Sequence, residues 1–278
     1  MDFHDGRVKK FWEIIEPLVH FPIGDRSGLG EDRDPIQLSC NEVAGQAMEL
    51  TVLIGAVCKH NFKDLFEKYL KEKRRKCYEY VLSEIRQPGV NCVFGLDFAR
   101  IYWLDKEWVE RKIESIFSNE LWDETWGTYI SWGRPSTNGF KLLVEKGKYG
   151  RAVEQLGQAN KFAFQKNPEE GLVEHLMIGF FNGWIELDDD LLKEFFEKGS
   201  AELRGKSARF LATGFKSVNE EGGGEKEKVA GRMKEYWERR LAAIEKKPEE
   251  NIDEAVEFTG WVKDTLLDAE TTLGLLER

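Results

Sequence analysis

The feature of this sequence that most constrains its fold is the stretch from Gly89 to Leu156, in which apolar residues recur three and four positions apart. This spacing places them on one face of an α-helix, because a helix turns once every 3.6 residues. At that spacing aromatic rings mostly pack into a core. The stretch therefore predicts the middle of a stack of helices, and its tryptophans are Trp103, Trp108, Trp122, Trp126 and Trp132.

The same helical spacing continues on both sides of this stretch. No segment alternates β-branched and polar residues between turn signals, so no strand is expected. The segment 41–59 has few polar residues, which predicts burial on more than one side. The predicted N-terminal capping residues are Asn41, Asp105 and Asn119. Helices are predicted over 7–19, 41–59, 61–87, 105–117, 119–132 and 140–156, then after Pro168, after Asp188, around 203–215 and 229–244, and over 255–262 and 269–276.

About a dozen helices joined by short turns leave two architectures, a globular bundle and an α-solenoid. Successive hairpins need their neighbours to bury their apolar faces, which favours the solenoid. We therefore predict an all-α fold, an α-solenoid of stacked antiparallel helix pairs of the HEAT/TPR-like kind, as a single helical-repeat domain over residues 1–278. Flexible loops are expected near residues 22–35 and 219–226, where glycines and charged residues gather.

Composition narrows the class of protein. Hydrophobic residues make up 41% of the chain and charged residues 33%, which is typical of a globular protein. No apolar run approaches the roughly 20 residues that cross a bilayer, and the first residues carry no export signal. We therefore expect a cytoplasmic protein with no membrane partner. The last residues carry no helix C-cap or polar tail, which indicates a module of a longer system.

Charge and cysteine spacing argue against several kinds of partner. The net charge of −10 is spread along the chain and disfavours nucleic acid. The basic run from Lys71 to Lys76 contains Glu72, so a solvated helix face is the simpler interpretation and nucleic-acid contact the alternative. We expect buried free thiols, no metal site and no cofactor, because there is no CxxC pair among Cys40, Cys58, Cys77 and Cys92.

Two groups of residues are candidates for function. Trp132 and Arg134 fall in a segment with glycine and proline, where burial is not required and where an aromatic ring beside an arginine suits a binding hot spot. The alternative is an enzyme site assembled from His175, Glu174 and Asp188. His175 has no second histidine three or four residues away, so a structural histidine is the simpler interpretation. No catalytic residue is assigned.

Several segments resemble the C-terminal helical-repeat region of large prokaryotic antiviral defence proteins that carry a STAND-like ATPase or a sirtuin-like domain. The resemblance implies a sensor or scaffold array that binds a protein ligand, with an effector in cis or in trans. The chain departs from those proteins in having no phosphate loop and no Rossmann-like strand pattern. The similar segments are Asp34 to Leu50, Val90 to Val109, Ile116 to Ile130, Val173 to Gly183 and Leu191 to Leu211.

The leading hypothesis is a non-enzymatic helical-repeat module that binds protein, as the recognition region of a defence system. The alternatives are the enzyme described above and a nucleic-acid-binding helical array, which requires a continuous basic groove.

Overall fold

The computed structural model describes residues 3–21, 33–85, 88–221 and 225–262, together with Gly274 and Glu277. These residues form helices and no strand, so the prediction of an all-α fold is confirmed. Contacts divide the chain into unit 1, residues 1–142 and 159–168, and unit 2, residues 143–158 and 169–278. Each unit is described by itself, and the single domain expected over residues 1–278 stays a prediction.

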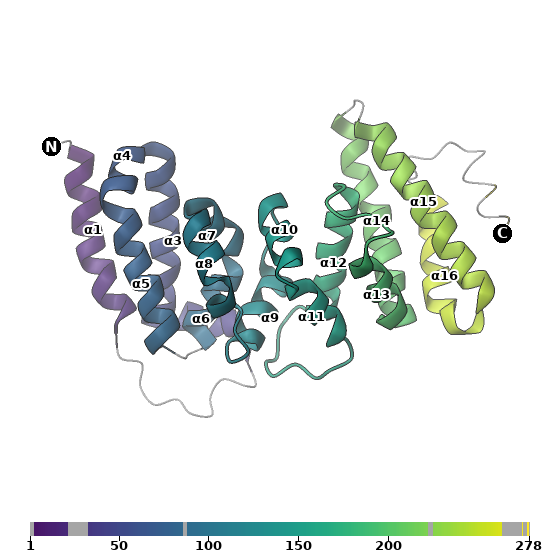
Figure 1. Ribbon diagram of the computed structural model, residues 1–278, viewed down its shortest axis with the longest axis horizontal. Coiled ribbons are helices and arrows are strands. Elements are labelled where there is room, and N and C mark those ends of the chain that lie inside the picture. Colours follow the sequence, from purple (N-terminus) through teal and green to yellow (C-terminus); the bar gives the residue numbers. More distant parts are fainter. Residues whose placement is uncertain are drawn as a thin grey trace. The chain divides into compact units, whose positions relative to one another are not determined.

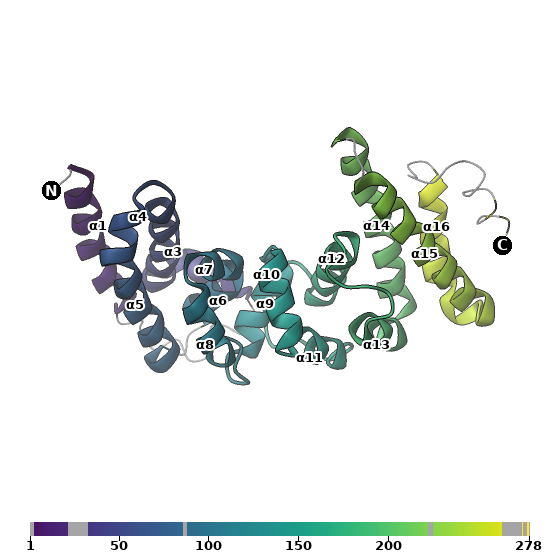
Figure 2. The same ribbon diagram turned by 45° about the horizontal axis from the view of Figure 1, so that its top comes forward.

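Unit 1 holds the helices that precede the second half of α10. Helix α1 packs on α3, α3 packs on α6, and α6 packs on α9, so each helix covers an apolar face of one that lies near it in the sequence (Figures 1 and 2). The elements are α1 (Phe3–Val19), α2 (Pro35–Asn41), α3 (Val43–Asn61), α4 (Lys63–Leu65), a π-helical turn (Phe66–Leu70), α5 (Lys71–Glu84), α6 (Pro88–Leu96), α7 (Phe98–Leu104), α8 (Lys106–Ile116), α9 (Trp122–Trp132) and α10 (Thr137–Glu145).

Unit 2 begins within α10 and contains the longer helices. Helices α14, α15 and α16 contact one another and lie side by side in both views (Figures 1 and 2). Gly147 divides α10 from α11 with a φ of 68°, a left-handed conformation that glycine adopts without strain. The elements are α11 (Lys148–Glu154), α12 (Pro168–Phe181), α13 (Asp190–Lys198), α14 (Ala201–Glu221), α15 (Glu225–Lys246), a 3-10 turn (Glu249–Asn251), α16 (Ile252–Phe258) and a final 3-10 turn (Thr259–Val262).

Parts of the predicted loops and the last predicted helix fall where the structure makes no description. Most of the expected loop 22–35 and nearly all of the helix 269–276 lie outside the described residues. At the second expected loop, 219–226, α14 extends to Glu221 and α15 begins at Glu225, so only residues 222–224 lie outside them.

Two of the three predicted helix caps are wrong. Asn41 ends α2 rather than starting the next helix, because Asp34 caps α2 earlier and Pro35 supplies the φ angle of a first helical turn. Asn119 caps nothing, since α9 begins at Trp122 and the Oγ of Ser118 accepts a hydrogen bond from the Leu121 N–H. Helix starts therefore depend on neighbouring residues that a single-residue signal does not capture.

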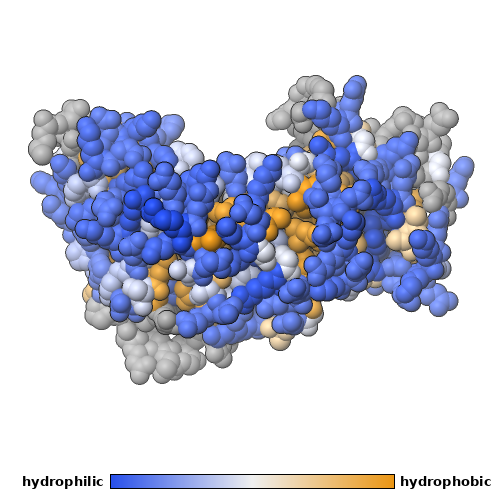
Figure 3. Space-filling view, in the orientation of Figure 1, coloured by the Kyte–Doolittle hydropathy of each residue, from blue (hydrophilic) through white to orange (hydrophobic). Residues whose placement is uncertain are grey.

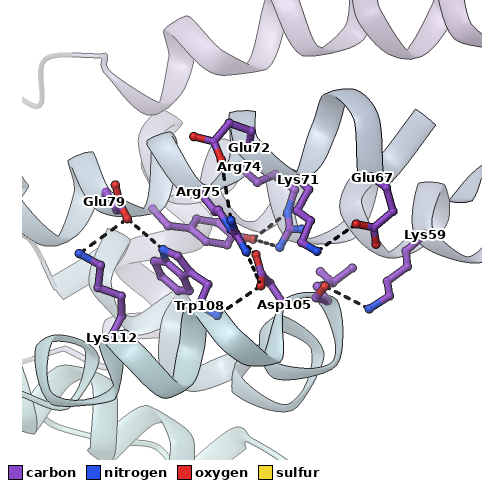
Figure 4. A network of polar contacts seen from close by, with 12 residues as sticks. Lys59, Glu67, Lys71, Glu72, Arg74, Arg75, Glu79, Asp105, Trp108 and Lys112 are labelled. Carbon is purple, nitrogen blue, oxygen red and sulfur yellow. Dashed lines mark hydrogen bonds and ion pairs between the residues drawn. The ribbon is translucent and has the colours of Figure 1, made fainter. Parts of the chain in front are cut away.

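The third predicted cap, Asp105, is confirmed and does more than begin a helix. Its Oδ1 accepts a hydrogen bond from the Trp108 N–H at 3.3 Å, and its two oxygens accept hydrogen bonds from Arg75 at 2.5 and 2.9 Å. Figure 4 shows this carboxylate facing the Arg75 side chain of α5. Asp105 therefore joins the start of α8 to α5 through a bidentate ion pair.

The basic run Lys71–Lys76 is not the solvated helix face that the sequence predicts. Arg74 is 1% exposed, donates two hydrogen bonds to the Tyr78 hydroxyl and lies over the Phe66 and Tyr78 rings. The other cations of the run except Lys76 form ion pairs with acidic side chains, which are Lys71 with Glu67, Lys73 with Glu16, and Arg75 with Glu72 and Asp105. Half of this run is therefore structural.

The surface is mostly hydrophilic, with hydrophobic residues exposed in separate patches (Figure 3). Among the described helices none combines the length and the apolar character that a membrane crossing needs. Three of the cysteines, Cys58, Cys77 and Cys92, are buried free thiols as predicted, whereas Cys40 is exposed. Burial raises the pKa of the Cys77 thiol to about 12, which leaves it protonated and unreactive near neutral pH.

Asp105→Ala should lower the free energy of unfolding by about 3 kcal/mol, because it removes a helix cap and leaves Arg75 without its buried partner. Although burial raises the pKa of Asp105, the hydrogen bonds and charge of Arg75 outweigh it and the pKa lies below its usual value. The folded state therefore favours the ionised form, and this stabilisation is lost as pH falls below about 4.

Urea denaturation from pH 7 down to pH 3 measures this effect. The gap between the wild type and Asp105→Ala should narrow as the solution becomes acidic. Asp64→Ala is the matched control, since the Asp64 side chain is 91% exposed and its pair with Lys68 contributes little. An equal effect of the two variants would contradict the assigned role of Asp105.

Candidate functional site

The most prominent exposed apolar surface of unit 1 lies on α3 and α7. The side chains of Val43, Leu53 and Val57 are 46%, 50% and 47% exposed, and Trp103 of α7 is 49% exposed. Leu50 of α3 is half-buried between them in sequence. We call these five residues the α3–α7 surface. The sequence predicts burial of α3 on more than one side, but this row of its apolar residues faces outward.

The spacing of the α3 residues matches one helix face. Val43, Leu50, Leu53 and Val57 follow one another at intervals of seven, three and four residues. Residues at these intervals form a continuous stripe along a helix, and such a stripe is how one helix receives another. An isolated exposed apolar residue needs no explanation, but a stripe of this kind marks an interaction site.

A groove runs beside this stripe between α3 and α7. It has a volume of about 340 Å³ and is lined by Gln46, Glu49, Leu50 and Leu53 of α3 and by Asp97 and Arg100 near the start of α7. Leu50 and Leu53 belong to both the stripe and the groove. Arg100 stands three residues before Trp103 on the same helix, which places the two on one face. The apolar stripe and the groove therefore form one surface.

Lys59 fixes Trp103 relative to α3. Its Nζ donates hydrogen bonds to the backbone oxygens of Trp103 and Leu104, at 2.5 and 3.1 Å, and lies 4.8 Å from the centre of the Trp103 ring. A lysine at these positions satisfies carbonyl groups at the end of α7 that have no partner within the helix. Figure 4 shows Lys59 directed at a main-chain oxygen. Trp103 is therefore exposed and held in place.

The groove carries a slight excess of negative charge. Glu49 accepts a hydrogen bond from the Ser39 hydroxyl, and Asp97 forms an ion pair with Arg100. Burial raises the pKa of Asp97, an effect that the charge of Arg100 opposes without cancelling. The two carboxylates face a single guanidinium in the groove lining, which favours a ligand that brings positive charge.

Trp132 and Arg134, the binding residues that the sequence indicates, lie at the end of α9. Trp132 is the last residue of that helix rather than part of the loop, and it is 40% exposed. Its indole N–H donates a hydrogen bond to Oδ2 of Asp34 at 3.0 Å, and the Gln165 N–H donates to the same oxygen at 3.1 Å. Trp132 is thus tied into the fold, whereas Arg134 is exposed.

His175, Glu174 and Asp188, the alternative catalytic set, have different environments in unit 2. His175 is 2% exposed on α12, and its Nδ1 shares a hydrogen bond of 3.0 Å with the Tyr149 hydroxyl. Glu174 is half-buried. The Asp188 side chain is 72% exposed and pairs with Arg239 of α15, which lowers its pKa through a hydrogen bond and charge. This distribution gives no shared pocket with a base, an acid and a substrate position.

A row of buried polar atoms on α9 has no counterpart in the sequence interpretation. Glu124, Thr128 and Ser131 are 5%, 0% and 2% exposed, and they lie on one helix face at intervals of four and three residues. One side-chain oxygen of each is buried and has no hydrogen-bond partner in the part of the chain that is described. Glycine is required between them, because a Cβ at Gly127 would lie 2.3 Å from the Phe164 ring.

No group of three or more metal-ligating side chains occurs among the residues described. Comparison of the chain with protein-family models, with curated proteins and with solved structures finds no match. Function is therefore inferred from the geometry of the two units alone.

Trp132→Phe tests whether this residue serves stability or binding. The variant keeps an aromatic ring but removes the N–H that bonds Asp34, so the free energy of unfolding should fall by about 2 kcal/mol, the value of a hydrogen bond to a charged group. Chemical denaturation measures it. Trp103→Phe is the control and should cost less than half as much. An unchanged stability of Trp132→Phe would return Trp132 to the role of an exposed hot spot.

Glu124→Gln should make the protein more stable at pH 7. Burial raises the pKa of Glu124 more than its own backbone N–H and the charge of Lys161 lower it. The unfolded chain therefore releases this proton first, and stability falls as pH rises above about 4.3. Thermal unfolding between pH 4 and 8 should show a weaker fall for Glu124→Gln. The exposed Glu13→Gln should follow the wild type, and the same behaviour of Glu124→Gln would refute this assignment.

Proposed function

We propose that this chain is a non-enzymatic helical-repeat module that binds a protein partner on the α3–α7 surface. The single observation that carries the proposal is the row of exposed apolar residues on α3 beside the fixed indole of Trp103. An enzyme site receives no comparable support, since His175 and Asp188 have separate partners.

The occupant that fits this surface is a basic amphipathic helix. Apolar side chains at intervals of three and four residues would lie along Val43, Leu50, Leu53 and Val57. Basic side chains beside that seam would meet the two carboxylates of the groove. The net charge of −10 would also attract such a segment at a distance.

This proposal extends to the architecture and the setting of the chain. Helix pairs that pack on their sequence neighbours, as α1, α3, α6 and α9 do, are compatible with a degenerate α-solenoid. A solenoid of this kind would be the recognition region of a prokaryotic antiviral defence system, and its effector would be supplied in cis or in trans. The resemblance of segments such as Asp34 to Leu50 supports this setting.

A synthetic helix tests the docking surface. The probe is a 21-residue peptide with leucine at heptad positions and lysine beside them, and its scrambled sequence is the negative control. Leu53→Asp should weaken peptide binding at least tenfold, or about 1.4 kcal/mol, because it places a charge in the middle of the apolar seam. Fluorescence anisotropy of a labelled peptide measures the affinity.

Ile252→Asp is the matched control variant, since Ile252 is a 63% exposed apolar residue of unit 2. Its affinity for the peptide should equal that of the wild type. Circular dichroism confirms that both variants remain helical. Absence of binding to the wild type, or equal binding to Leu53→Asp and the wild type, would refute the docking surface.

A further inference from the structure

Unit 2 contains a cavity of about 430 Å³ that the proposed protein-binding surface does not use. It is formed by side chains of α13, α14 and α15, the segment before α13 and the 3-10 turn that follows α15. Its size falls in the range of cavities that take small molecules. Its lining is unusually basic for a chain of net charge −10, with the five cations Lys193, Arg204, Arg239, Arg240 and Lys247.

Two of these arginines are fixed from behind by a buried carboxylate. Glu254 of α16 is 0% exposed and accepts hydrogen bonds from Arg240 at 2.6 and 2.9 Å and from Arg204 at 2.8 Å. Arg204 also donates to Asn251 and to the backbone oxygen of Gly199. One carboxylate shared by two guanidinium groups leaves a net positive charge at the wall of the cavity. The two arginines are therefore held in place before any ligand arrives.

The same arginines retain hydrogen-bond donors. A guanidinium carries five N–H donors, of which Arg240 uses two and Arg204 uses three in the hydrogen bonds above. Planar, pre-oriented donors of this kind match the oxygens of a phosphate or a carboxylate. The excess of positive charge and the unused donors together favour an anion.

The remaining cations lie in exposed ion pairs that a ligand can displace. Arg239 pairs with Asp188 and Glu235, Lys247 pairs with Glu250, and Lys193 pairs with Asp190. Each of these side chains is at least 41% exposed, and exposed pairs contribute little stability. Two carboxylates, Glu197 and Glu250, line the cavity against its five cations, which gives the lining a net charge of +3.

One wall of the cavity is aromatic. Phe196 of α13 lines it, and the Arg240 guanidinium lies 4.5 Å from the centre of that ring. Leu187 and Ala243 add apolar surface. A cavity with an arginine cluster on one side and apolar groups on another accommodates a molecule that has an anionic and an apolar part.

We propose that this cavity binds a small organic phosphate of about the size of a nucleoside monophosphate. The phosphate would contact Arg204, Arg239 and Arg240, and the organic part would lie toward Phe196. Guanidinium forks favour the tetrahedral, doubly charged phosphate over a single carboxylate. This inference concerns unit 2 alone and does not depend on the proposed helix-binding surface of unit 1.

Isothermal titration calorimetry of the full chain tests the proposal with three probes, which are adenosine monophosphate, inorganic phosphate and citrate. Adenosine monophosphate should bind most tightly, inorganic phosphate more weakly, and citrate least. The double variant Lys193→Gln with Arg239→Gln should weaken binding at least tenfold, because it removes two cations while leaving the pairs of Glu254 in place. Raising the salt concentration should also weaken binding.

Arg209→Gln is the matched control, because Arg209 is 63% exposed, pairs with Glu257 on the same unit and does not line the cavity. It should bind all three probes as the wild type does. Failure of the wild type to bind any probe would overturn the proposal, as would equal binding by the double variant. Tighter binding of citrate than of adenosine monophosphate would overturn the assignment to a phosphate.

Discussion

Buried carboxylates that join distant segments are the interaction on which both units depend. In unit 1, Asp34 is 1% exposed and accepts hydrogen bonds from Ile36 at the start of α2, from Trp132 at the end of α9 and from Gln165. A buried charge of this kind is costly without donors, so these segments stay together only if all three contribute. In unit 2, Glu254 holds α14 to α15 in the same way. Apolar faces decide which helices pack, and these carboxylates fix how they meet.

The sequence predicts the helices well because their apolar spacing reflects local geometry. The division of 140–156 at Gly147 and the cap at Asp105 are examples that the structure confirms. The wrong caps at Asn41 and Asn119 have a common reason, since each lost to a nearby capping residue, Asp34 or Ser118, whose chain geometry was better placed. Periodicity predicts which residues share a face, but the position at which a helix begins depends on competition among several polar side chains.

The candidate sites were much harder to predict, because they depend on which faces remain uncovered. Leu53 and Val57 look like core residues in the sequence, and only the arrangement of α1, α6 and α7 around α3 leaves them exposed. Trp132 shows the reverse case, since its place near Gly133 and Pro135 suggests exposure while Asp34, far away in the sequence, binds its indole. No local pattern encodes a partner 98 residues away. Burial is a property of the assembled unit.

Basic residues show most clearly why local density misleads. The run Lys71–Lys76 concentrates positive charge in the sequence, yet its cations are taken up by Glu16, Glu67 and Asp105 or, for Arg74, buried against aromatic rings. The basic cavity of unit 2 draws its cations from three helices, where no single segment looks basic. Because two arginines share Glu254, that cluster keeps both charge and donors to spare. The capacity to bind an anion therefore depends on how many carboxylates the fold brings to each cation, and that ratio is set by tertiary structure.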